Sequence, residues 1–183
     1  MRGEVRFAGF GGQGIISAGR ITGRAAVIHD GNHAVLIQSY GPEARGGACS
    51  AEVIISSSPA TYPRVTMPEV AVLMSQEAYE KYGHDVRPGG VILVDPDLVE
   101  YEERDDVRVI PVPATRIAEK LGKRIVANVV MLGALAAVWD KVTVEGMRNA
   151  VLESVPPHTV DLNRRAFEEG VKYAEGILHA QKK

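Results

Sequence analysis

Gly9-Phe10-Gly11-Gly12-Gln13-Gly14 lies between an apolar run, which includes Val5, Phe7 and Ala8, and a segment of helical periodicity that begins at Ile15. A strand, a glycine-rich turn and a helix in this order open a doubly wound α/β domain. The glycines allow a tight turn, a close approach of the backbone to a ligand or another chain, and packing of the helix on the strand at Gly14. Free N–H groups at the start of the helix favour an anion. The sequence therefore predicts a three-layer α/β/α, Rossmann-like open sheet.

One residue of a typical dinucleotide site is missing. Such a site carries an Asp or Glu about 20 residues after the turn, at the end of the second strand, where it binds the ribose. Here the second strand, residues 33–38, ends in Gln38-Ser39, and Asp30 precedes it. The turn therefore either binds a dinucleotide without this residue or, in the favoured interpretation, serves packing or a protein neighbour. A free-standing dehydrogenase is the weakest hypothesis, since no catalytic base is indicated either.

Composition narrows the class of protein. The length of 183 residues suits one domain over residues 1–183. A net charge of −2 without a basic cluster argues against nucleic-acid binding. No apolar run reaches the ~18 residues of a membrane span, and Met1-Arg2-Gly3-Glu4 leaves no room for a signal peptide before the first strand. We expect a soluble, cytoplasmic chain. A single cysteine, Cys49, excludes an internal disulfide and a Cys-only iron–sulfur or zinc site within the chain.

A second glycine-rich segment follows the second strand. It reads Ser39-Tyr40-Gly41-Pro42-Glu43-Ala44-Arg45-Gly46-Gly47, and its glycines and proline disfavour a regular element. If the first two strands run parallel, both glycine-rich segments meet at the carboxyl edge of the sheet, where open α/β proteins bind ligands. Arg45 is then placed to bind a phosphate or carboxylate. The alternative is a surface arginine paired with Glu43.

The remaining elements are predicted from periodicity and from turn residues. The strand at residues 51–56 follows the second strand without an intervening helix, so we expect an antiparallel pair in an otherwise mostly parallel sheet. Further strands are expected at residues 70–73, 91–94 and 107–111. Helices are expected at residues 15–28, 76–82, 114–121, 129–139, 145–153 and 162–179.

Three expectations concern single residues or short motifs. In the first helix, Ile15, Ile21 and Ile28 fall on the face that should be buried. Asp95-Pro96-Asp97 offers two carboxylates for a metal or for acid–base chemistry, but a turn and cap is the favoured interpretation. Asn128 either caps the helix that follows it, which is the favoured interpretation, or points into the site.

Three segments together resemble a known family. They are Gly9 to Gly14, Gln38 to Gly47, and Asn128-Val129-Val130-Met131-Leu132-Gly133. In this pattern the chain is similar to the gamma subunit of 2-oxoacid:ferredoxin oxidoreductases of the pyruvate, 2-oxoglutarate or ketoisovalerate type. The same unit is a domain of single-chain pyruvate:ferredoxin oxidoreductase and a subunit of indolepyruvate oxidoreductase. The resemblance covers nearly the whole chain.

The resemblance implies an activity and a set of partners. Such enzymes convert a 2-oxoacid and coenzyme A to acyl-CoA and carbon dioxide and reduce ferredoxin; 2-oxoglutarate is the favoured substrate, followed by pyruvate or a branched-chain oxoacid. Thiamine diphosphate, magnesium and iron–sulfur clusters would be held by the alpha, beta and, where present, delta subunits. This chain would bind no cofactor or metal, carry no catalytic residue of its own and be inactive alone.

The resemblance also places residues at the site. Those expected to face a ligand or the assembled active site are Gly11, Gly12, Gln13, Gly14, Ser39, Tyr40, Arg45, Gly46, Gly47 and Asn128. Arg45 is expected to bind an anionic group or a partner subunit. The alternative function is a stand-alone regulatory module that binds a nucleotide or coenzyme A through the glycine turn.

Overall fold

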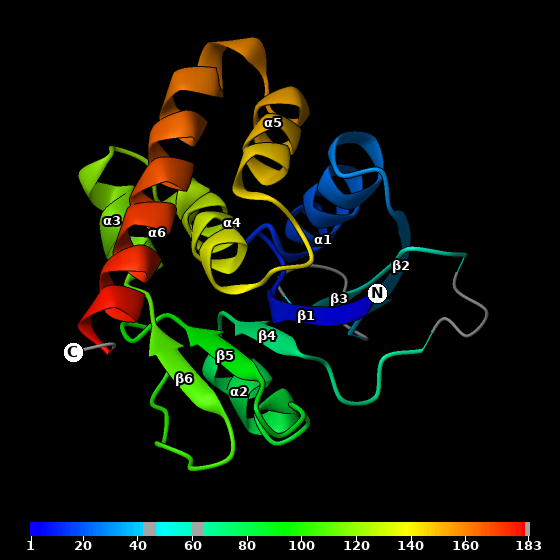
Figure 1. Cartoon of the computed structure of the whole chain (residues 1–183). Coiled ribbons are helices and arrows are strands. Elements are labelled where there is room, and N and C mark those ends of the chain that lie inside the picture. Colours follow the sequence, from blue (N-terminus) through cyan, green and yellow to red (C-terminus); the bar gives the residue numbers. More distant parts are fainter. Residues whose placement is uncertain (42–46, 60–63, 182–183) are drawn as a thin grey trace.

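A computed structural model describes residues 1–41, 47–59 and 64–181, and in this part of the chain a six-stranded sheet forms the centre (Figure 1). The spatial order of its strands is β2-β3-β1-β4-β5-β6. Strand β1 pairs with β4 in parallel, as do β4 with β5 and β5 with β6, whereas β3 is antiparallel to both β1 and β2. The prediction of a mostly parallel sheet with an antiparallel hairpin is confirmed. The strands are β1 Arg2–Phe10, β2 His33–Tyr40, β3 Ala48–Ser56, β4 Val70–Leu73, β5 Val91–Val94 and β6 Arg108–Pro111.

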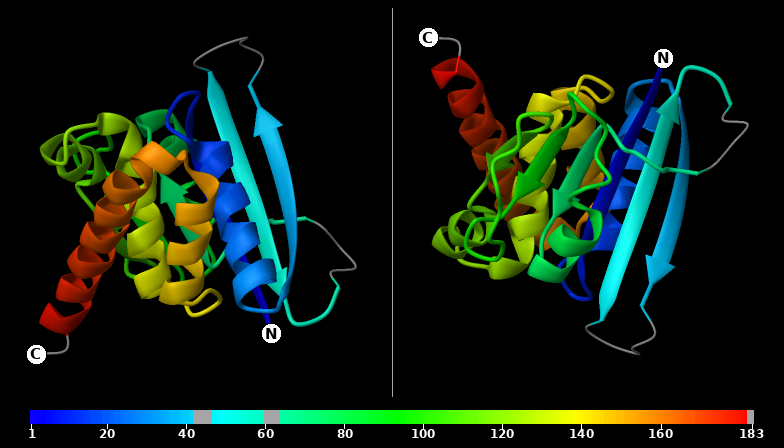
Figure 2. Two further views of the ribbon diagram at one scale, coloured as in Figure 1. Left: turned by 90° about the horizontal axis from the view of Figure 1, so that it is seen from above. Right: turned by 90° about the horizontal axis from the view of Figure 1, so that it is seen from below.

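The helices cover the two faces of the sheet unequally. Helices α1, α4, α5 and α6 lie over one face, and α2 lies on the other (Figures 1 and 2). The β2–β3 hairpin runs along one side of the molecule, where α1 packs on it. The helices are α1 Ile15–Arg24, α2 Gln76–Tyr82, α3 Ala114–Lys120, α4 Ala127–Val138, α5 Val144–Ser154 and α6 Val160–Ala180; short turns of other helix types are η1 Ala25–His29, η2 Arg124–Val126 and η3 Pro157–Thr159.

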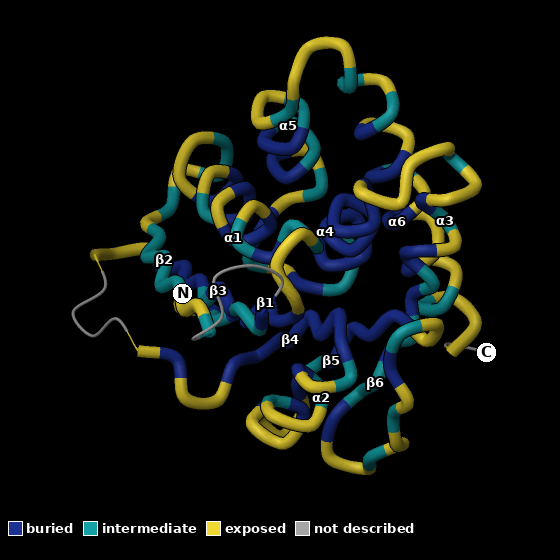
Figure 3. Tube along the Cα trace, turned by 180° about the vertical axis from the view of Figure 1, so that it is seen from behind, coloured by how far each residue is buried: buried dark blue, intermediate teal, exposed yellow. Residues whose placement is uncertain are grey.

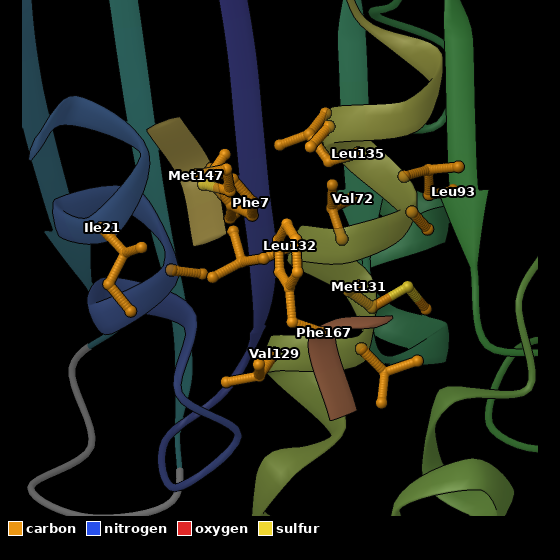
Figure 4. Close-up of a cluster of buried hydrophobic side chains, with 14 of the residues drawn as sticks. Phe7, Ile21, Val72, Leu93, Val129, Met131, Leu132, Leu135, Met147 and Phe167 are labelled. Carbon is orange, nitrogen blue, oxygen red and sulfur yellow. The ribbon is translucent and has the colours of Figure 1, made fainter. Parts of the chain in front are cut away.

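The main core lies between the sheet and the four-helix face. Figure 3 shows buried backbone through β1, β4 and α4, and Figure 4 shows the cluster that joins them. Phe7 from β1 and Leu132 from α4 meet Phe167 from α6 there, and all three side chains are at most 1% exposed. Helix α4 is the central helix of this core, with ten buried residues on all its sides.

Glycines bring α4 and α6 together. A Cβ at Gly133 of α4 would lie 2.1 Å from the carbonyl oxygen of Phe167, and a Cβ at Gly170 of α6 would lie 2.0 Å from the carbonyl oxygen of Val130. Each glycine thus receives the backbone of the other helix. This contact fixes α4, whose first turn borders the site described below.

The first helix departs from its prediction at its end. We expected a continuous helix to Ile28 with that side chain buried, but Ile28 is 63% exposed. The regular helix ends at Arg24 and continues as a π-helical turn, in which the N–H of Asp30 donates to the carbonyl of Ala25, 3.0 Å away. The wider turn carries more residues per revolution, which rotates Ile28 away from the core.

Asp95 confirms the favoured interpretation of the Asp95-Pro96-Asp97 motif. Its carboxylate accepts the N–H of Asp97 at 3.0 Å and the N–H of Thr115, at the start of α3, at 2.8 Å. Asp95 is fully buried. It therefore serves the turn after β5 and the start of α3, and its two oxygens are used within the protein.

Candidate functional site

The two glycine-rich segments meet, as predicted. The N–H of Gly11 donates to the carbonyl of Gly47 at 2.9 Å, and the N–H of Gly41 donates to the carbonyl of Ala48 at 2.6 Å. Because β3 lies between β1 and β2 and is antiparallel to both, the carboxyl ends of β1 and β2 lie beside the amino end of β3. Residues 42–46 lie outside the described part, so the expected roles of Arg45 and Gly46 stay predictions.

The turn after β1 depends on two glycines in the left-handed region. Gly12 has φ 90° and Gly14 has φ 74°, a conformation that side chains with a Cβ rarely adopt. A Cβ at Gly14 would lie 2.3 Å from Nδ2 of Asn128. We predicted that Gly14 allows α1 to pack on the strand; the group that its missing side chain admits is instead Asn128, from the first turn of α4.

Gln13 braces the turn from inside. Its Oε1 accepts the N–H of Phe10 at 2.7 Å, and its Nε2 donates to the carbonyl of Met74 at 2.8 Å. This side chain joins the end of β1 to the end of β4, whose following helices α1 and α2 lie on opposite faces of the sheet. Such a switch point is where open α/β proteins bind ligands. Here the side chain of Gln13 occupies this point with hydrogen bonds to Phe10 and Met74.

Asn128 does not cap a helix, and the favoured prediction for it is wrong. The turn η2 leads directly into α4, which begins at Ala127, so Asn128 already lies inside the first helical turn. Its Nδ2 donates to the carbonyl of Gly14 at 3.2 Å. Asn128 also lines the groove described below, and its role in a functional site stays a prediction.

A large apolar groove opens beside the turn. Its volume is about 950 Å³, and it is bounded by the glycine turn, the starts of α1 and α4, and the connection between α5 and α6. Phe10, Tyr40 and Ile125, which line it, are 37%, 67% and 71% exposed. Lys123 is the one charged residue among the described residues that line the groove. An exposed apolar surface of this kind marks a site for a protein or an apolar ligand.

The groove gathers most of the predicted site residues that the structure describes. Those that line it are Gly11, Gly12, Gly14, Tyr40, Gly47 and Asn128. Gln13 does not, because its side chain is used in the turn. Ser39 does not line it either. Ser39 pairs with Ser50 and so shares its face of the sheet, whereas the adjacent Cys49 lies on the groove face.

Sequence patterns did not identify three other parts of the groove wall, which are Ile125 and Lys123 before α4 and the chain from Ser154 to Asn163. An apolar Ile125 directly after two cations, Lys123 and Arg124, is the one local signal that was available.

Cys49 lies in the inner wall of the groove. Its thiol is half-buried and packs against the main core, and this burial raises its pKa above the ordinary value of 9.0. A raised pKa lowers the thiolate fraction at any given pH, and the thiolate is the reactive form. We expect iodoacetamide at mildly alkaline pH to alkylate Cys49 several-fold more slowly than it alkylates glutathione. Urea should restore the rate; equal rates in the folded chain and in glutathione would contradict the burial.

No group of three or more His, Cys, Asp or Glu side chains among residues 1–41, 47–59 and 64–181 is arranged to hold a metal ion. Within the same ranges, no helix combines the length and the apolar content needed to cross a bilayer.

The fold and the groove define a Rossmann-like α/β domain whose glycine turn is braced from inside and opens onto an apolar surface. The family model for pyruvate ferredoxin/flavodoxin oxidoreductase matches residues 4–173. The chain therefore belongs to this family, and the resemblance inferred from its sequence is confirmed.

Individual relatives extend over the whole chain. The chain is 51% identical over 180 residues to the 2-oxoglutarate synthase subunit KorC of Methanocaldococcus jannaschii, covering 97% of this chain and 96% of the relative. It is 47% identical over 189 residues to KorC of Methanothermobacter marburgensis, covering 100% of both. The solved gamma subunit of a keto/oxoacid ferredoxin oxidoreductase from Geobacter sulfurreducens matches with a TM-score of 0.88 and 44% identity, over 96% of this chain and 98% of that one.

Proposed function

We propose that the chain is the gamma subunit of a 2-oxoacid:ferredoxin oxidoreductase that acts in the cytoplasm, with 2-oxoglutarate as its favoured substrate. The complex would convert the oxoacid and coenzyme A to acyl-CoA and carbon dioxide and pass the electrons to ferredoxin. Two relatives at about half identity, both matched over nearly their full length, are named as subunits of 2-oxoglutarate synthase, which supports this substrate. Pyruvate or a branched-chain oxoacid is the next candidate.

The apolar groove is the observation that supports a role of the chain inside a complex. Phe10, Tyr40 and Ile125 border it, and exposed apolar surface of this extent beside an ordered turn is typical of an interface. We assign the groove to contact with the larger subunits, alpha, beta and, where present, delta. The Gly11–Gly47 contact holds the two glycine-rich segments at this same surface, so partner contact and the loop that carries Arg45 would be linked.

The cofactors of the complex would then be held by its other subunits. An iron–sulfur cluster needs a set of cysteine ligands, and this chain has only Cys49. Thiamine diphosphate, magnesium and the clusters would supply the chemistry of decarboxylation and electron transfer elsewhere in the complex. This chain would shape the surface beside that chemistry, with Arg45 binding an anionic group or a partner, and it would be inactive alone.

A pull-down under anaerobic conditions tests the proposal. The tagged chain is recovered from its native cells and assayed for oxoacid-dependent reduction of viologen with coenzyme A. We expect larger subunits to be recovered with it and 2-oxoglutarate to give the highest rate, with pyruvate and a branched-chain oxoacid as comparisons. A chain recovered alone and inactive would contradict the proposal. Calorimetric titration with coenzyme A, AMP and NAD would then test the stand-alone binding module.

A further inference from the structure

A second pocket lies on the opposite face of the sheet from the groove. Its volume is about 220 Å³, and it is lined by the ends of β1 and β2, the start of β3 and one side of α2. Side chains alternate between the two faces along a strand. Cys49 packs against the core on the groove side, so the adjacent Ser50 points to the α2 side. The two cavities therefore share backbone but present different side chains.

Three small side chains form the floor of this pocket. Ala8 of β1 pairs with Ser50 of β3, and Ser50 pairs with Ser39 of β2, so the three lie in a row across adjacent strands. Side chains at directly paired positions are neighbours on one face. The floor is hollow because these side chains are small and because α2 packs mainly on β4 and β1. Two hydroxyl groups are thereby placed side by side.

Ser50 is buried without a hydrogen-bond partner. The residue is 5% exposed, and its hydroxyl forms no hydrogen bond within the described part of the chain. In that part of the chain, every side-chain polar atom that is fully sealed from solvent has a hydrogen-bond partner. The hydroxyl of Ser50 has none, so it is not fully sealed and opens into the pocket. A hydroxyl that has lost most of its water and gains no bond is unfavourable. A ligand in the pocket can therefore supply the missing hydrogen-bond partner of the Ser50 hydroxyl.

Two opposite charges line the α2 side of the pocket. Lys81 and Glu77 lie one helical turn apart, both are exposed, and neither forms an ion pair with another described residue. The Lys81 ammonium lies 5.2 Å from the centre of the Tyr82 ring, and the Arg6 guanidinium lies 4.7 Å from the same ring. Arg6 is itself held by Glu52 at 2.8 Å. The Tyr82 ring beside Lys81 therefore packs on an arginine that is itself held in an ion pair.

We propose that this pocket binds the carboxylate group of a small, singly charged molecule. The hydroxyls of Ser39 and Ser50 donate to the carboxylate oxygens, and Lys81 supplies the opposite charge. Glu77 repels a second negative charge, so a carboxylate is favoured over a phosphate dianion. Since water screens Lys81 and the ligand offers few contacts, the expected Kd is on the order of 1 mM. Ser39, Ser50 and Lys81 do not line the groove, and the proposal does not rest on the function proposed for the groove.

Titration of the full-length, ¹⁵N-labelled chain with sodium acetate tests this site by NMR. We expect saturable shifts of the amides of Ser50 and Lys81, and no such shifts with acetamide, the neutral isostere, or with phosphate at matched ionic strength. Ser50→Ala and Lys81→Gln should each raise the Kd for acetate about tenfold, or about 1.4 kcal/mol. Glu77→Gln should allow phosphate to bind.

Matched controls use residues outside the pocket. Lys172→Gln on α6 and Glu80→Gln on α2 remove the same charges and should leave the Kd for acetate unchanged. The amide spectrum of each variant shows whether it is folded, and Lys81→Gln alters an exposed side chain. Shifts that do not saturate, that acetamide reproduces, or that persist unchanged in Ser50→Ala and Lys81→Gln would overturn the proposal.

Discussion

Replacing Gly170 with alanine is expected to destabilise the chain by about 3 kcal/mol, the upper end of the usual range for overpacking. The new Cβ would lie 2.0 Å from the carbonyl oxygen of Val130 and 3.1 Å from the N atom of Ala134, both in the backbone of α4. Neither atom can rotate away, so α4 and α6 must separate. For a domain of this size the expected fall in Tm is roughly 6–12 °C. Circular dichroism during thermal and urea unfolding measures both quantities.

Gly176 provides a matched control in the same helix. It is exposed, and a Cβ there would meet nothing within 4 Å. Gly176→Ala should therefore stabilise the chain by about 0.5–1 kcal/mol, because alanine loses less backbone entropy in a helix than glycine does. Equal effects of the two substitutions would show that helix propensity, and not the contact between α4 and α6, determines the result.

Local signals were sufficient to predict most of the fold. The apolar run before Gly9, the glycine turn and the periodic segment from Ile15 correspond to β1, the turn and α1. Ser75 and Thr143 cap α2 and α5, because each accepts a backbone N–H three residues later, at 3.1 Å and 2.9 Å. Strand, turn and cap signals lie within a few residues of the structure that they specify.

The features that were missed depend on contacts between distant residues. Asn128 lies inside a helical turn because η2 joins α4 without a break, and its partner Gly14 is 114 residues away. Gln13 bridges to Met74 across 61 residues. The exposure of Ile28 follows from the π-helical turn η1, which a regular helical period does not anticipate. The close contact between Gly133 of α4 and Gly170 of α6 could likewise be identified only from the structure.

Replacing Ile125 with aspartate is expected to reduce the recovery of partner subunits at least tenfold, which is the loss expected for a central interface residue. Ile125 borders the groove and is 71% exposed. In the free chain a charge there is solvated, so the free energy of unfolding should change by no more than about 0.5 kcal/mol. In the complex the same charge would be buried against an apolar partner, where its desolvation is unfavourable.

Ile28→Asp is the matched control, because Ile28 is 63% exposed in η1, directly after α1, and does not line the groove. It adds the same charge in place of the same side chain and should leave recovery and viologen reduction unchanged. The two variants are compared with the unaltered chain in the tagged pull-down, with thermal unfolding of each purified chain measured in parallel. Loss of partners from Ile125→Asp alone, at unchanged Tm, would assign assembly to the groove. Full recovery of the partner subunits with Ile125→Asp would contradict that assignment. Equal losses in both variants would contradict it too, because an added charge outside the groove would then have the same effect as one inside it.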